Sequence, residues 1–166
     1  MLYIQNLTKA RIDKKLLKKV SEKTLKIAGV KQKAEISLVI ISNKKIRELN
    51  KKYRGIDQAT DVLSFSQLET PLKNSKAKSE LAKSKLQNPK VKFIGPPDKI
   101  LRLGEIFISY QKAKAQAIQR QHTVKKEIAF LFIHGILHLL GYKHTGKNEA
   151  KKMQKLERKI LYSLFN

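Results

Sequence analysis

The sequence predicts an α+β domain in which a single mixed sheet of about four strands is covered by about five helices. Two observations lead to this class. The first is that the chain contains both short segments rich in β-branched residues and longer segments whose apolar residues recur every three or four positions. The second is the order of these segments along the chain, which is β-α-β-α-β-β-α-α-α. Elements in such an order pack as helices against one sheet. At 166 residues the chain is long enough to bury a core as one domain.

The first half of the sequence predicts three strands and two helices. Residues 2–7 form the first strand, and Thr8 is the expected N-cap of a helix that ends at Gly29. The other elements of this half follow in order: a buried strand at 35–42, a helix that is capped by Ser42 or Asn43 and ends near Arg54, and a strand at 60–67.

The second half predicts one strand and three helices. The strand covers residues 103–109, and Ser109 caps a helix that reaches about Gln121. Thr123 caps the next helix, at 123–140. A last helix starts at about Asn148 and packs back on the core through apolar residues on one face, which are Met153, Leu156, Ile160, Leu161 and Leu164.

Residues 69–99 interrupt this pattern. The segment holds all four prolines of the chain, eight lysines and only three acids, with few large apolar residues. Such a composition buries too little surface to offset the entropy lost on ordering, so we expect a lysine-rich, mobile insertion. Two roles remain open for it, a solvated linker or an arm that contacts a polyanion.

The charge balance favours a polyanionic partner. There are 37 basic and 13 acidic side chains, with a formal net charge of +24. Nucleic acid is the obvious candidate, because each neutralised phosphate releases condensed counterions. Lysine far outnumbers arginine, which suits contacts to phosphate better than the reading of bases. A generally lysine-rich proteome is the alternative explanation.

Composition also limits the compartment and the ligands. There is no cysteine, so disulfides are excluded, and any metal must be held by His, Asp or Glu. The longest apolar segment, at 128–142, contains two histidines and is too short to span a bilayer. The first residues lack the basic flank and apolar core of a signal peptide. We therefore expect a cytoplasmic protein without a membrane partner.

The stretch 132–144 holds three of the four histidines. His134 and His138 stand four residues apart in a predicted helix, so they project from one face. Gly141 allows the helix to end in a left-handed turn, after which His144 can return towards the other two. This is the histidine spacing of the metzincin zinc site, and three imidazoles leave one tetrahedral position open. A lone helix-face histidine is usually not a ligand, but three at these offsets predict a metal site on the central helix and the loop after it.

The residue after the first histidine argues against a peptidase. Metalloproteases of this type have Glu there as the general base, and this chain has Gly135. A metallopeptidase is therefore disfavoured, although the ligands remain. We expect one Zn²⁺ per chain, with another divalent metal such as Ni²⁺ as the alternative.

The histidine stretch, His-Gly-x-Leu-His-Leu-Leu-Gly-Tyr-x-His, resembles the signature of the YbeY family of bacterial metal-dependent endoribonucleases. Three more stretches are similar to the family in the same order, namely Leu-Asn-Lys-Lys-Tyr-Arg-Gly at 49–55, Thr-Asp-Val-Leu-Ser-Phe at 60–65 and Leu-Gly-Glu-Ile-Phe-Ile-Ser at 103–109. The resemblance implies one α+β domain over 1–166, in which 69–99 replaces a shorter connection.

For function, the resemblance implies a single-strand-directed endoribonuclease that acts in maturation of ribosomal RNA and ribosome quality control. Its partner would be RNA, in particular that of the small ribosomal subunit. The chemistry would use metal-activated water or a phosphate polarised by the metal, and the sequence does not separate these routes. The alternative is a non-catalytic ribosome- or RNA-binding assembly factor with a structural metal.

Arg54 is the predicted catalytic side chain. It stands at a helix end, in the position of the functional arginine of the family that this chain resembles. A guanidinium presents paired donors that match phosphate. We therefore expect Arg54 to stabilise negative charge on the scissile phosphate.

Three other residues are candidates for the surroundings of the site. Glu127 either accepts a hydrogen bond from a ligand histidine or faces solvent, paired to a lysine such as Lys126. Glu105, where the family usually has Asp, is expected to orient its strand against the metal-bearing helix. Lys143, where the family commonly has Asp, either binds phosphate or weakens the site. His122 is expected to be a surface or hinge residue.

Overall fold

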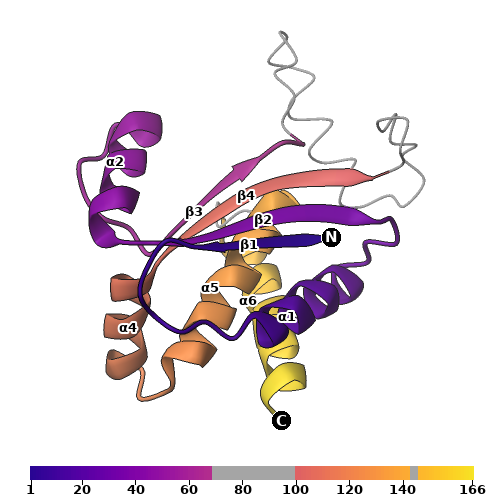
Figure 1. The fold of residues 1–166 in the computed structure, drawn as a ribbon. Helices are drawn as coiled ribbons and strands as arrows, with labels where there is room; N and C mark the ends of the chain where they lie inside the picture. Colours follow the sequence, from indigo (N-terminus) through magenta and orange to yellow (C-terminus); the bar gives the residue numbers. More distant parts are fainter. Residues whose placement is uncertain (69–99, 143–145) are drawn as a thin grey trace, which may run out of the picture.

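The computed structural model describes residues 1–68, 100–142 and 146–166 (Figure 1). The predicted insertion at 69–99 lies outside the described residues, as do Lys143 and His144. No helix in the described ranges is long and apolar enough to cross a membrane.

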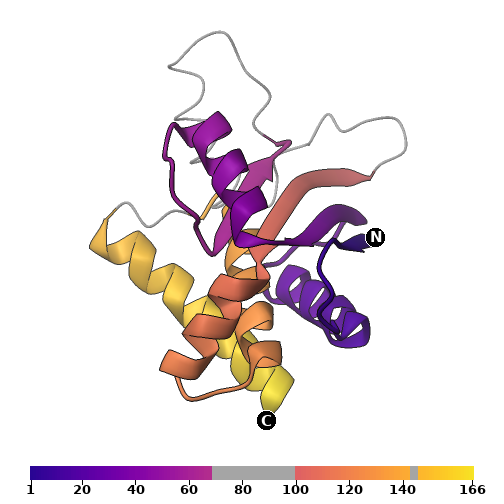
Figure 2. The same ribbon diagram turned by 60° about the vertical axis from the view of Figure 1, so that its left-hand side comes forward.

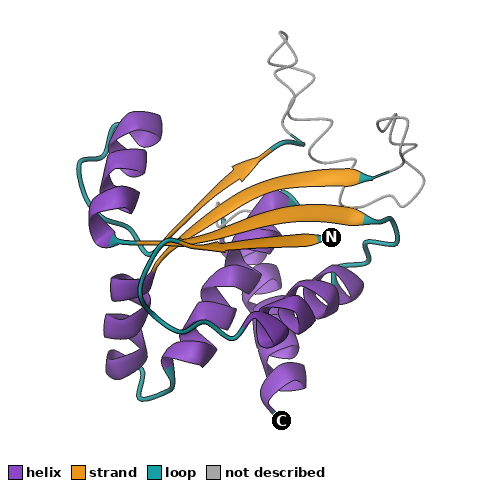
Figure 3. Cartoon of the chain, in the orientation of Figure 1, coloured by secondary structure: helices purple, strands orange, loops and turns teal. Residues whose placement is uncertain are grey.

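One mixed sheet forms the centre of the fold (Figure 3). Its strand order is β1-β2-β4-β3. β1 (Leu2–Asn6), β2 (Ala34–Ile41) and β4 (Leu101–Ser109) are parallel, and β3 (Val62–Ser66) runs antiparallel to β4 at one edge. In the described part of the chain five helices accompany the sheet: α1 (Lys14–Ile27), α2 (Asn43–Arg54), α4 (Tyr110–Gln119), α5 (Val124–Leu139) and α6 (Lys147–Phe165). The predicted fold class and element order are confirmed.

The helices lie on both faces of the sheet, with α2 on one face and α1, α5 and α6 on the other (Figures 1 and 2). Neighbouring residues of β2 show why, since successive side chains of a strand point to opposite faces. Leu38 belongs to the buried cluster that includes α5, whereas Val39 packs with Ile46 of α2. Because this part of β2 is covered on both faces, its last four residues, at 38–41, form a continuous apolar run.

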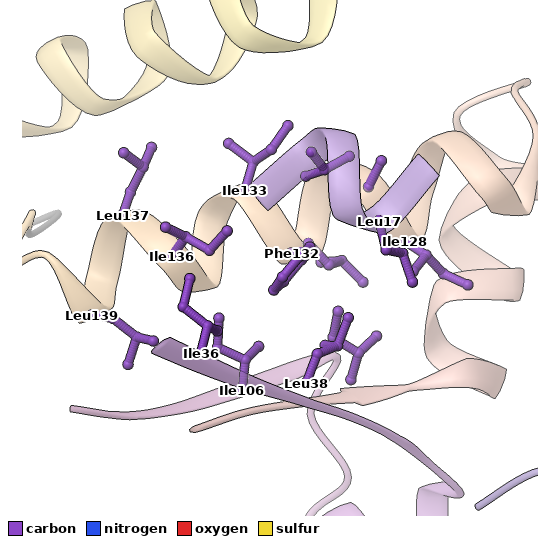
Figure 4. Close-up of a cluster of buried hydrophobic side chains, with 14 of the residues drawn as sticks. Leu17, Ile36, Leu38, Ile106, Ile128, Phe132, Ile133, Ile136, Leu137 and Leu139 are labelled. Atoms are coloured by element: carbon purple, nitrogen blue, oxygen red, sulfur yellow. The ribbon is translucent and has the colours of Figure 1, made fainter. Parts of the chain in front are cut away.

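The central helix α5 is buried between the sheet and α6 (Figure 4). Phe132 and Ile136 point towards Ile36 and Ile106 of the sheet, and all four are fully buried. Ile133 points away from the sheet, towards α6. Each such side chain contributes about 1.5–3 kcal/mol by leaving water, so packing on both sides holds the helix firmly.

Gly135 allows α5 to approach the sheet closely. A Cβ atom at this position would lie 2.8 Å from Cγ2 of Ile106 on β4. Gly104 has a similar role between β3 and β4, where a Cβ atom would lie 2.0 Å from the carbonyl oxygen of Phe65. Its φ of +131° is also rarely adopted by residues with side chains.

Of the four helices for which an N-cap is predicted, three are confirmed to have it. Ser42, Ser109 and Thr123 each accept a hydrogen bond from the backbone N–H three residues later. The prediction that Thr8 caps α1 is wrong. The cap is Asp13, whose Oδ1 accepts from the Leu16 N–H at 2.9 Å.

Thr8 does not cap α1 because its polar groups are used in a local turn. Its N–H and its hydroxyl both donate to Oδ1 of Asn6, at 3.0 and 2.8 Å. A turn closed by an Asn side chain in this way competes with helix initiation. The chain therefore remains irregular until Asp13.

Candidate active site

Two of the predicted ligands lie side by side on the C-terminal half of α5. The imidazole centroids of His134 and His138 are 4.6 Å apart, and the rings are inclined at 76°. Their Nε2 atoms are 3.1 Å apart. Both side chains project from the same face of the helix, as their spacing predicts.

The other nitrogen of each ring is held by an oxygen. Nδ1 of His134 lies 2.8 Å from Oε1 of Glu157 on α6, and Nδ1 of His138 lies 2.9 Å from the backbone oxygen of Tyr142. Carboxylate and carbonyl oxygens accept hydrogen bonds, so both contacts suit the tautomer in which Nδ1 carries the proton and Nε2 presents a lone pair. Two lone pairs directed into one small volume suit a cation there.

The donor set therefore fits a metal ion, since neutral imidazole with a hydrogen-bonded Nδ1 is the usual form of a ligand histidine. Within the described ranges no group of three potential ligand side chains is found. The third predicted ligand, His144, lies outside those ranges. The structure thus describes the positions of two of the three predicted ligands, and metal binding by all three stays a prediction.

Glu157 is a site residue that the sequence analysis missed. Its carboxylate is almost completely buried, with 7 % exposure, and lies within hydrogen-bond distance of the His134 ring, with 2.8 Å between Oε1 and Nδ1. Glu157 lies on the buried face of α6, between Met153 and Ile160. An acid at this helical spacing within an apolar stripe is a signal that marks a buried, paired carboxylate.

The sequence predicts that Glu127 either accepts a hydrogen bond from a ligand histidine or faces solvent beside a lysine, and both predictions are wrong. The side chain is fully buried, so it does not face solvent, and its partners are Arg120 and His122. The contacts are 2.7 Å to Nη1 of Arg120 and 2.9 Å to Nε2 of His122. The carboxylate that holds His134 is Glu157 instead. Glu127 lies in the first turn of α5, where a negative charge is favourable. Its contacts with Arg120 and His122 attach the segment between α4 and α5 to this turn.

Glu105 does not orient β4 against α5. It is exposed and lies opposite Phe65 of β3 in the ladder. The adjacent residue, Ile106, is the one that packs on α5 beneath Gly135. Since neighbouring strand residues point to opposite faces, Glu105 is directed to the face that carries α2. The prediction for Glu105 is wrong.

Arg54 is the last residue of α2 and is exposed. None of the contacts found among the described residues joins it to His134 or His138, and α2 lies on the other face of the sheet from α5 (Figure 2). The two regions meet at β3. On one face the rings of Tyr53 and Phe65 are 5.0 Å apart, and on the other the Ser66 hydroxyl donates to the Leu139 backbone oxygen at 3.2 Å.

Asp61 has a structural role at the start of β3. Its carboxylate accepts from the Gln116 amide at 2.9 Å and from the Val62 N–H at 2.8 Å. Burial by itself raises the pKa of Asp61, but these hydrogen bonds and one from Thr60 lower it by more, so the pKa lies below its ordinary value. Asp61 thereby ties β3 to α4.

A pocket of about 310 Å³ lies elsewhere, between the N-terminal ends of α1 and α5. Apolar side chains such as Leu17 and Ile128 line it, with Lys125 and Asp13 among its polar residues. Neither histidine lines this pocket. It is therefore separate from the histidine pair.

The fold and the site together define a class of α+β proteins with a candidate metal-binding histidine pair on a buried central helix. A sequence model described as Endoribonuclease YbeY matches residues 3–164. This chain belongs to that family, and the predicted family and enzyme class are confirmed.

Individual relatives agree with this assignment. Endoribonuclease YbeY of Dehalococcoides mccartyi is 45 % identical over 128 residues, which cover 77 % of this chain and 67 % of the relative. The protein of that name from Caldicellulosiruptor bescii is 35 % identical over 167 residues, covering 98 % and 96 %. A solution structure of TM1509 from Thermotoga maritima is similar with a TM-score of 0.59 and 26 % identity, covering 99 % of this chain and 89 % of that one.

Proposed function

We propose that this protein is a metal-dependent endoribonuclease that cleaves single-stranded RNA in ribosomal RNA maturation. His134, His138 and His144 are the proposed ligands of one Zn²⁺ ion, and the proposed place of action is the cytoplasm. The family supports the nuclease activity. The net charge of +24 supports an RNA partner, because it raises the local concentration of a polyanion.

One observation carries the metal in this proposal: the two Nε2 atoms face each other at 3.1 Å while both Nδ1 atoms are held by acceptors. When bound, the ion would act as a Lewis acid towards a phosphoryl oxygen or a water molecule. The chain itself orients the ligands. Glu157 holds the His134 ring and the Tyr142 carbonyl holds the His138 ring, so neither ring has to reorient on binding. For Arg54 we propose contact with a phosphate of the bound strand in place of the scissile phosphate expected from the sequence, because α2 and the histidine pair lie on opposite faces of the sheet.

A peptidase is not supported by the packing. Glutamate at position 135 would bring its Cβ atom within 2.8 Å of Cγ2 of Ile106. Either β4 or α5 would have to shift to admit any side chain there. Position 135 also faces the sheet rather than the histidine pair.

The experiment that tests the proposal compares chelated and reconstituted protein. Labelled single-stranded RNA should be cleaved by protein reloaded with Zn²⁺ and not by chelated protein, with a duplex of the same sequence as control. Elemental analysis should find about one metal per chain, because one site needs the three imidazoles together. His138→Ala should lose both metal and cleavage. Cleavage that survives chelation would contradict the proposal, and metal-loaded protein that binds RNA without cleaving it would favour an assembly factor.

A further inference from the structure

Tyr53 is an exposed aromatic residue near the end of α2. Its relative exposure is 57 %, although one side of the ring is supported. The Tyr53 and Phe65 rings meet at 62° with centroids 5.0 Å apart, and Phe65 in turn contacts Phe107 at 5.8 Å. The Tyr53 ring is thus supported by the Phe65 ring while much of its surface remains in water.

The charges of α2 are distributed unevenly around this ring. The helix carries six cationic side chains and one acid. Asp57, just after the helix, pairs with Arg47 at 2.7 Å and Lys51 at 3.0 Å. Hydrogen bonds from these two cations lower the pKa of Asp57 to about 2, so it stays charged at neutral pH. Glu48 pairs with Lys45.

The cations next to Tyr53 are not neutralised in this way. Neither Lys52 nor Arg54 forms an ion pair with another residue in the described part of the chain. Lys52 Nζ lies 5.2 Å from the centroid of the Tyr53 ring. The exposed ring is therefore flanked on both sides in the sequence by a cation that is available to an anionic ligand.

We propose that Tyr53 stacks on a base of single-stranded RNA while Lys52 and Arg54 contact the flanking phosphates. This inference rests on the proposed function, since it supplies a binding subsite for the same RNA. The chemistry matches a single strand, in which a base and a phosphate recur together. Aromatic rings that stack on bases and grooves of positive charge are the usual means of binding such strands. Neither base stacking nor phosphate contact depends strongly on the nucleotide sequence of the strand.

The position of Tyr53 relative to the histidines indicates a route for the strand. Phe65, against which Tyr53 packs, and Ser66, which bonds to the residue after His138, are neighbours on β3. β3 is an edge strand. Among the described strands β3 forms one edge of the sheet, so a path along this edge leads an RNA strand from Tyr53 on one face to the histidine pair on the other (Figures 1 and 2). Tyr53 therefore binds a nucleotide away from the cleaved bond.

The test measures affinity for a nuclease-resistant single strand, a labelled 2′-O-methyl phosphorothioate oligonucleotide, by fluorescence anisotropy with metal-loaded protein. Tyr53→Ala should weaken binding about 5- to 100-fold, as expected for one lost stacking contact. Tyr53→Phe keeps the ring and should bind like the wild type. Tyr162→Ala is the matched control, because Tyr162 on α6 is also exposed, at 71 %, and should leave affinity unchanged.

A second variant separates stacking from local folding. Tyr53→Leu keeps an apolar contact with Phe65 but has no ring, and should lose as much affinity as Tyr53→Ala without a change in melting temperature. An abasic oligonucleotide should bind wild type and Tyr53→Ala more equally than an ordinary one does. If Tyr53→Ala and Tyr53→Leu bind as tightly as wild type, the subsite is wrong although the proposed function stands. A wild-type protein that neither binds nor cleaves RNA contradicts both.

Discussion

The two histidines on α5 are oriented by partners of different kinds. The partner of His138 is the backbone oxygen of Tyr142, whose position follows from the end of the same helix. The partner of His134 is the Glu157 side chain, which comes from α6. His138 is therefore oriented once α5 has formed, whereas His134 also depends on the docking of α6. A carboxylate partner further increases the basicity of the ring as a ligand.

Replacing Glu157 should weaken metal binding. We expect Glu157→Gln to lower Zn²⁺ affinity about 10-fold and Glu157→Ala up to about 100-fold, the range typical of such outer partners. Competition with a chromophoric chelator measures this without reference to activity. Glu22→Ala is the control, because Glu22 is an exposed acid on α1. Wild-type affinity in Glu157→Ala would show that His134 does not need the carboxylate.

The sequence predicts the histidine pair but not its supporting acid, and the reason is physical. The four-residue spacing of His134 and His138 is a local helical property. Glu157 stands 23 residues after His134, and their contact exists only because α6 packs against α5. The same holds for Glu127, whose burial depends on how Arg120 and His122 fold back over it.

At the scale of elements, the approach of α5 to β4 is set by a glycine. Glycine in a helix interior normally destabilises by about 0.5–1 kcal/mol relative to alanine, through backbone entropy. At position 135 this cost is offset by the packing of the α5 backbone directly against the Ile106 side chain, which a Cβ atom would prevent. The closer the backbone lies to the sheet, the more fully Phe132 and Ile136 are buried on either side of it.

Gly135→Ala should therefore destabilise the protein, in contrast to its usual effect in a helix. We expect a loss of about 1–3 kcal/mol in the free energy of unfolding, the typical cost of overpacking. Urea denaturation measures it. A double-mutant cycle with Ile106→Ala supplies the control, since removing the obstructing side chain should make the second substitution nearly harmless. Additive effects in that cycle would mean that Ile106 is not the cause.

Local sequence patterns predict where helices and strands occur better than they predict the order in which the strands pair. The caps Ser42, Ser109 and Thr123 bond to backbone groups three residues away, so their function is visible in the sequence. Thr8 gave the same signal, but Asn6 competes for its polar groups. The strand order β1-β2-β4-β3 depends on pairings between distant segments, and the sequence contains no comparable local signal for it.

At the scale of the whole molecule, positive charge surrounds the sheet on both faces. α1, α2 and α6 each carry six cationic side chains, against one, one and two acids. α2 lies on one face, and α1 and α6 on the other (Figure 1). The long-range attraction of RNA is therefore not confined to one side of the protein, which favours rapid, unspecific association before the strand settles at a site.

The lysine-rich segment at 69–99 is predicted to add to this attraction through direct phosphate contacts. Each contact to a single strand adds roughly −0.7 to the slope of log K against log salt. Deleting residues 72–91 removes six lysines and one acid. If those lysines bind phosphate, the slope measured across a series of KCl concentrations should flatten, while the metal content stays that of the wild type.

Replacing the same six lysines with glutamine separates charge from chain length, since the segment keeps its size. We expect the glutamine variant to match the deletion, because counterion release depends on the charges that meet phosphate and not on the length of the loop. The alternative is that the segment is a solvated connection between β3 and β4. In that case its lysines stay hydrated and unpaired with phosphate, and both variants should keep the wild-type slope. A flattened slope in the deletion alone would point to chain length, and so would contradict the phosphate contacts.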